Sequence, residues 1–310
     1  MPPALELRSV TKTFGPTCAV DALDLEVPAG TTCGMIGPSG AGKTTCIRMI
    51  MSILFPDSGE MSVLGHRSAL EAKDRIGYLP EERGVYRKMR VADFLLYIGQ
   101  LKGVPAATAA RRADGLLTRL GLGEAARKRC EDLSKGMLQR VQFVAAVVNE
   151  PALLILDEPF SGLDPVSVRT LKEVIADEQR RGATILFSTH VMAHAEELCQ
   201  HVVMIHRGRK VLDEPMAGLR RQFDPRVIRF EPLDADASAL PLLRALPGVE
   251  SAEARGDEYE IRLAPGMDPA SAMRRIADAV APARMELARV RLEDVFVRIV
   301  KERPPEVAAL

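Results

Sequence analysis

The sequence lacks an excess of charge of either sign. Lysine and arginine together number 42 in 310 residues, and aspartate and glutamate also number 42. A net charge of zero argues against a general nucleic-acid-binding protein, because such proteins use basic residues to neutralise phosphates. A local basic patch stays compatible with this balance, so only a broadly basic surface is excluded.

Cysteine pairs and long apolar runs are also missing. The five cysteines include no C-x-x-C pair and no metal-site spacing, and their number is odd. We therefore expect free thiols and a reducing, cytosolic compartment. The longest apolar run, 143–148, is far too short to span a bilayer, and no signal-peptide pattern is present near the N-terminus. Any role at a membrane is expected to depend on a partner protein.

A glycine-rich segment is the strongest feature that the sequence does contain. It matches G-x-x-x-x-G-K-[ST] with the residues Gly37, Pro38, Ser39, Gly40, Ala41, Gly42, Lys43 and Thr44. The apolar residues before it can end a buried strand, and those after it recur at helical spacing. This strand–loop–helix context favours a phosphate-binding loop over an accidental glycine-rich turn.

The chemistry of this loop suits a nucleotide. Backbone N–H groups and the positive end of the helix dipole can surround phosphate oxygens. Lys43 is expected to reach the β- and γ-phosphates, and the Thr44 hydroxyl is expected to ligate Mg²⁺. The loop residues and the next residue, Thr45, are therefore the candidate ATP-binding residues.

Two consecutive acids, Asp157 and Glu158, follow the apolar run 153–156. Carboxylates at the end of a buried strand rarely serve packing. Asp157 is expected to hold the Mg²⁺ of the nucleotide, and Glu158, one residue further, to accept a proton from the attacking water. The alternative is a pair of solvated acids, which a phosphate-binding loop in the same chain makes less attractive.

Strands and helices are predicted to alternate through residues 1–215. The apolar runs at 153–156 and 184–187 are typical of parallel strands buried on both faces, whereas period-two alternation at 23–27 favours a half-exposed antiparallel strand. The segment 81–130 shows helical stripes without sustained heptads. We predict an α/β domain with a mostly parallel sheet, an antiparallel β subdomain and a helical subdomain.

The pattern changes after residue 215. Residues 216–225 are predicted to be a linker and 226–310 a separate accessory domain. A strand–helix–strand–strand–helix–strand order predicts a small ferredoxin-like α+β fold. One further helix, 292–301, carries an apolar stripe that the sheet does not need. We expect this stripe to pack on another surface or within its own domain.

Five motifs in order make residues 1–215 similar to the ATPase subunit of ABC transporters. Besides the phosphate-binding loop and the two acids, 133–137 resembles the signature motif, 161–164 the D-loop and 188–190 the segment with the switch histidine. This family has a P-loop NTPase fold, so the resemblance implies an ATPase that uses ATP and Mg²⁺.

The resemblance also assigns further site residues. It implies phosphate contacts from Ser134 and Gly136, a catalytic role for His190 beside Glu158 and Lys43, and stacking of Phe14 on adenine. Phe14 replaces the commoner tyrosine, but stacking needs only the face of a ring.

The signature motif and one further position also depart from the family pattern. The signature reads LSKGM in place of LSGGQ, and Glu81 stands where the family usually has glutamine. Glu81 is a candidate nucleotide-binding and metal-ligating residue; the alternative is a solvated hinge residue. The segments 82–86 and 292–296 resemble the ATPases of ABC-2-type exporters, which suggests export.

The resemblance implies two partners and a location. A second copy of the ATPase is expected to close the nucleotide site with its signature helix, in a homodimer. A polytopic membrane permease is expected to bind near 83–95, which places the protein in the cytoplasm on the inner face of the cell membrane. No nucleic-acid partner is expected. The rival interpretation is a non-transport ABC ATPase acting on ribosomes or DNA, although one set of motifs and no coiled-coil insertion argue against it.

Overall fold

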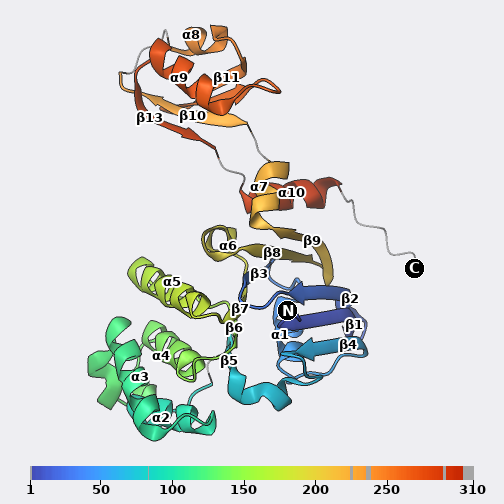
Figure 1. The fold of residues 1–310 in the computed structure, drawn as a ribbon, viewed down its shortest axis with the longest axis vertical. Coiled ribbons are helices and arrows are strands. Elements are labelled where there is room, and N and C mark those ends of the chain that lie inside the picture. Colours follow the sequence, from blue (N-terminus) through green and yellow to red (C-terminus); the bar gives the residue numbers. More distant parts are fainter. Residues whose placement is uncertain (1, 83, 224–225, 235–238, 289–290, 303–310) are drawn as a thin grey trace. The chain divides into compact units, whose positions relative to one another are not determined.

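The computed structural model describes every residue except 1, 83, 224–225, 235–238, 289–290 and 303–310. The chain divides into two units, Met1–Met216 and Ala217–Leu310, which are labelled by element in Figure 1. Each unit has its own sheets and helices. Among the described residues, no helix has the length and apolar character needed to cross a bilayer.

A six-stranded sheet forms the centre of the first unit. Its strand order is β5-β6-β7-β3-β8-β9, and all neighbours are parallel except β8 and β9. The strands are β3 (Thr32–Ile36), β5 (Ile76–Leu79), β6 (Leu153–Asp157), β7 (Thr184–Thr189), β8 (His201–His206) and β9 (Arg209–Pro215). Every residue of β3, β6 and β7 is buried, as continuous apolar runs predict for a sheet covered on both faces.

Helices cover one face of this sheet, and a second sheet packs on the other. Figure 1 shows α4 and α5 on one side, with α1 and the antiparallel strands on the opposite side. The helices of this unit are α1 (Lys43–Ile50), α2 (Val91–Leu101), α3 (Ala106–Arg119), α4 (Lys135–Val147), α5 (Pro165–Arg180) and α6 (Met192–Leu198), with 3-10 helices at Ala69–Arg75, Gly123–Arg127 and Cys130–Asp132. The helices α2 and α3 pack on each other and on α4, which makes the predicted helical subdomain.

The antiparallel sheet has the order β2-β1-β4. Its strands are β1 (Leu5–Phe14), β2 (Thr17–Val27) and β4 (Ser58–Val63). The inward side chains of β1 and β2 join one apolar cluster with Ile47 and Met49 of α1 and with residues of β3 and β6. Burial of a side chain of this size stabilises the fold by about 1.5–3 kcal/mol, so α1 is fixed between the two sheets.

The second unit contains the predicted ferredoxin-like sheet. The order β11-β12-β10-β13, antiparallel throughout, is the one that the βαββαβ pattern produces. Its elements are β10 (Val227–Pro232), α8 (Ala239–Ala245), β11 (Val249–Arg255), β12 (Glu258–Leu263), α9 (Pro269–Ala279) and β13 (Pro282–Leu287). Ile261 and Leu263 of β12 are buried and Arg262 between them is exposed, so these residues alternate between the two faces of the sheet.

The last helix lies outside the core of that sheet. The unit also has α7 (Met216–Gln222) and α10 (Leu292–Glu302). Leu292 and Val295 of α10 are buried, yet they do not belong to the cluster around Phe230. The Arg298 guanidinium lies 5.7 Å from the ring centre of Phe223, directly after α7. The last helix therefore lies next to a residue from the beginning of its own unit's sequence.

Candidate nucleotide site

The glycine-rich loop connects β3 to α1, as predicted. A Cβ at Gly37 would lie 2.2 Å from the carbonyl oxygen of Ile205, and one at Gly42 would lie 2.3 Å from that of Ala19. Both positions therefore need glycine because the neighbouring backbone comes too close for a side chain. Gly42 immediately precedes the first turn of α1, where unpaired N–H groups and the helix dipole favour an anion.

Lys43 is buried at the start of α1. Its Nζ donates to the carbonyl oxygens of Gly37 and Pro38, at 2.9 and 3.1 Å, and lies 3.9 Å from Oε1 of Glu158. Burial lowers the pKa of Lys43, and the nearby carboxylates, Glu158 first, act in the opposite direction. The ammonium thus sits among the oxygen atoms of the loop, where a phosphate oxygen can replace a carbonyl acceptor.

Thr44 brings two acids together. Its hydroxyl lies 3.3 Å from Oδ1 of Asp157 and 3.4 Å from Oε2 of Glu81. Asp157 is fully buried, and this burial raises the pKa of its carboxyl group, while hydrogen bonds from Ser188 and Thr44 act to lower it. Within the described part of the chain, Oδ2 of Asp157 is buried without a hydrogen-bond partner. A hydroxyl and carboxylates at this spacing are the oxygen donors that Mg²⁺ prefers.

Glu158 and His190 form a second pair. The Glu158 Oε1 and His190 Nδ1 atoms are 2.9 Å apart, and the Glu158 side chain is 12% exposed. Glu158 has a φ of 49°, a left-handed conformation that is uncommon for a residue with a side chain. Its N–H donates to Oγ of Ser188 at 3.0 Å. A carboxylate held at the edge of the phosphate loop, beside a histidine, is placed to receive a proton from water.

Strand register explains why these residues meet. In the parallel pair β6–β7, Asp157 is the partner of Ser188, so the residues that follow the two strands emerge side by side. The Ser188 hydroxyl donates to Asp157 and accepts from Glu158, which ties both acids to β7. Sequence reasoning used Ser188 only as part of a motif and missed this role. Its place at the end of a predicted strand was the available signal.

Other predicted site residues stand apart from this group. Phe14 is exposed at the end of β1, with Lys12 Nζ 5.7 Å from the centre of its ring. Ser134 caps α4, where its Oγ accepts from the N–H of Met137, and a Cβ at Gly136 would touch Gly162 at 3.4 Å. Within the described residues, no hydrogen bond or ion pair joins Ser134 or Gly136 to the glycine-rich loop.

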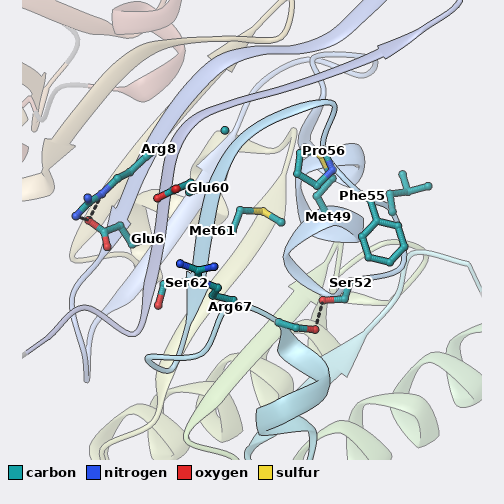
Figure 2. Close-up of a pocket in the computed structure, with 13 residues that line it drawn as sticks. Glu6, Arg8, Met49, Ser52, Phe55, Pro56, Glu60, Met61, Ser62 and Arg67 are labelled. Atoms are coloured by element: carbon teal, nitrogen blue, oxygen red, sulfur yellow. Dashed lines mark hydrogen bonds and ion pairs between the residues drawn. The ribbon is translucent and has the colours of Figure 1, made fainter.

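A separate hollow of about 490 Å³ lies beside the C-terminal end of α1 and the strand β4. Figure 2 shows Arg8 and Glu60 on one side of it and Met49 and Phe55 on the other. Its lining contains none of the residues predicted for the nucleotide site. The hollow is therefore not part of the constellation around Lys43.

Known proteins are similar to this chain over most of its length. The family model described as ABC transporter matches residues 20–161. The ABC transporter ATP-binding protein YhaQ of Bacillus subtilis is 37% identical over 296 residues, which cover 96% of this chain and 98% of that protein. The daunorubicin/doxorubicin resistance ATP-binding protein DrrA of Streptomyces peucetius is 32% identical over 94% of this chain and 86% of its own length.

Solved structures give the same result for the fold. An ATP-binding subunit of an ABC transporter is 32% identical and superposes with a TM-score of 0.66. The match covers 71% of this chain and 93% of that structure.

Proposed function

The chain belongs to the ATP-binding proteins of ABC transporters, and from this premise we propose that it works as a dimer that drives export through a separate membrane permease. Membership in this family makes the chain an ATPase that couples hydrolysis to transport. The observation that carries the proposal is the cluster of Lys43, Thr44, Asp157, Glu158 and His190 around one loop. It supplies phosphate binding, metal ligation and a base in one place.

In this proposal, each residue of the cluster has one task. Gly37 to Thr45 bind the phosphates through backbone N–H groups, and Lys43 adds its ammonium. Glu158 takes the proton of the attacking water, and His190, 2.9 Å away, orients Glu158 and the γ-phosphate. Phe14 is exposed and offers a ring face to adenine.

Mg²⁺ fits the oxygen atoms near Thr44. Within the described residues, the buried Oδ2 of Asp157 has no hydrogen-bond partner. A bound cation would supply the interaction that this oxygen atom lacks. Thr44 and Asp157, with Glu81 as a third donor, would hold the ion. No group of three or more His, Cys, Asp or Glu residues in the described part of the chain forms a metal site, so phosphates would have to complete the ligand set. When bound, the ion neutralises charge that develops on the phosphates.

A dimer would complete the site. The N-terminus of α4 offers Ser134 and Gly136 to an anion, yet among the described residues neither of them forms a hydrogen bond with the glycine-rich loop of its own chain. A second copy can present these residues to the nucleotide, as the family resemblance implies. We propose a homodimer with two nucleotides between its subunits.

An exposed aromatic group offers a surface to the permease. Tyr86 is 55% exposed and Tyr97 is 41% exposed, and their rings meet edge to face with centroids 5.5 Å apart. Both residues lie at or near the predicted contact segment 83–95, of which residue 83 is outside the described residues. Exposed aromatic clusters are typical of protein–protein interfaces. Through this contact the ATPase would lie on the inner face of the membrane. The Nod factor export ATP-binding protein I of Paraburkholderia xenovorans, which is 34% identical to this chain, supports export.

Hydrolysis by the purified chain, alone and with its permease in liposomes, tests the proposal. We expect activity that requires Mg²⁺, is lost in Lys43→Ala and is kept in Lys128→Ala, a matched change at an exposed lysine. Tyr86→Ala with Tyr97→Ala should keep hydrolysis by the free protein and lose stimulation by the permease. Hydrolysis that is independent of Lys43, or stimulation that survives the double change, would refute the corresponding part.

A further inference from the structure

Three carboxylates surround the start of α1. Glu81 and Asp157 each come within 3.4 Å of the Thr44 hydroxyl, and Glu158 comes within 3.9 Å of the Lys43 ammonium. Glu81 enters this group from the loop after β5, whereas Asp157 is the last residue of β6 and Glu158 follows it. The same small region must also receive the phosphates of a nucleotide.

Positive charge in this region is scarce. Lys43 contacts Glu158, and His190 pairs with that same carboxylate. The next cation along α1, Arg48, is 2.7 Å from Glu82. Among the residues that the structure describes, no lysine, arginine or histidine lies within ion-pair distance of Glu81 or Asp157.

A second observation points to a cation-binding site. Oδ2 of Asp157 is buried and has no hydrogen-bond partner in the described part of the chain, although the other oxygen of this carboxylate accepts from Ser188 and Thr44. A buried carboxylate oxygen without a donor is costly unless a cation satisfies it. The acids therefore define a place for a cation as well as a barrier to anions.

We propose that Glu81 makes nucleotide binding conditional on a divalent cation, so that the site rejects metal-free ATP. This inference rests on the proposed binding of ATP at the glycine-rich loop. Without the cation, the negative phosphates must approach Glu81 and Asp157 directly, and like charges at this distance repel. With the cation, the same carboxylates become attractive ligands. A glutamine at position 81 has no charge, so it would remove the penalty against free ATP and also weaken the hold on the metal.

Calorimetric titration with ATP tests the proposal without measuring activity. The dissociation constant is determined in excess MgCl₂ and in excess EDTA for the wild-type protein and for Glu81→Gln. We expect the ratio of the EDTA value to the Mg²⁺ value to fall at least about tenfold in Glu81→Gln. Glu81→Asp keeps the charge and should keep most of the ratio. Glu82→Gln removes the same charge one residue away and is the matched control, whose ratio should equal that of the wild type.

Two results would overturn the inference, and a third would refute the proposed function on which it rests. An unchanged ratio in Glu81→Gln would show that Glu81 does not sense the metal. A Glu81→Asp protein that behaves like Glu81→Gln would show that charge is not the cause. Failure of the wild-type protein to bind ATP even with Mg²⁺ would instead refute the proposed function beneath it.

Discussion

Replacement of Glu158 by glutamine is expected to separate ATP binding from ATP hydrolysis. The amide cannot accept the proton of water, and loss of a positioned base costs about 10²–10⁴-fold in rate. This loss corresponds to about 3–5 kcal/mol in the activation barrier. Binding should not suffer, because Glu158 attracts the Lys43 ammonium across 3.9 Å. At an effective dielectric constant of about 20, that attraction is about 4 kcal/mol before desolvation, and its removal frees Lys43 for phosphate.

Two measurements test whether Glu158→Gln keeps ATP binding while it loses hydrolysis. Phosphate release at saturating Mg·ATP gives the turnover, and calorimetric titration gives the dissociation constant. Glu173→Gln, at an exposed carboxylate of α5 that pairs with Arg169, is the control and should behave as wild type. Turnover of Glu158→Gln within about threefold of the wild type would refute the assignment of the base. A large loss of binding would show that Glu158 holds the loop in shape.

Three further predictions concern other parts of the chain. Ser188→Ala removes the buried hydrogen-bond donor of Asp157, so it should lower the free energy of unfolding by about 1–3 kcal/mol in urea titrations. It should also lower turnover, and unchanged stability would contradict the bridging role of Ser188. The side-chain hydrogen bond from Lys12, with two more hydrogen bonds, lowers the pKa of Asp57 to about 2, so its contribution to stability is present above its ordinary pKa and is lost as the pH falls towards 2. Asp57→Asn should therefore lower the melting temperature at pH 7 and approach the wild type near that acidic limit, and a constant difference would contradict this account. A chain truncated after residue 217 should still bind ATP but dimerise more weakly in sedimentation with ATP under non-hydrolysing conditions, whereas equal dimer affinity would leave the second unit without a role in dimerisation.

Much of the first unit was predictable because its signals are local. The apolar run before the glycines, the loop and the helical spacing after it define β3 and α1 within a few consecutive residues. The cap of α4 is also a local signal, since serine is a preferred residue at the N-terminus of a helix and the Oγ of Ser134 accepts from the N–H of Met137. The ferredoxin-like order of the second unit could also be read from alternating patterns, and the fold confirms it.

The parts that escaped prediction depend on residues far apart in sequence. Ser188 binds both acids only because β6 and β7 pair in a particular register, which no local pattern encodes. The neighbour of the last helix was equally hard to predict, because Arg298 lies next to Phe223, which comes much earlier in the sequence. The left-handed backbone of Glu158 is a third case, since a residue with a side chain gives no sign of that conformation in advance.

The register of β6 and β7 also limits how the ATPase can be controlled. Glu158 and His190 directly follow two hydrogen-bonded, buried strands, so the backbone of the sheet sets the places from which their side chains extend. A bound permease could not move these two backbone positions apart without breaking hydrogen bonds between β6 and β7. Glu81, on the loop after β5, and Ser134, at the start of α4, do not belong to this pair of strands, so they can shift without disrupting it. We therefore expect regulation of the ATPase to act on Glu81 and Ser134 and to leave the backbone positions of Glu158 and His190 unchanged.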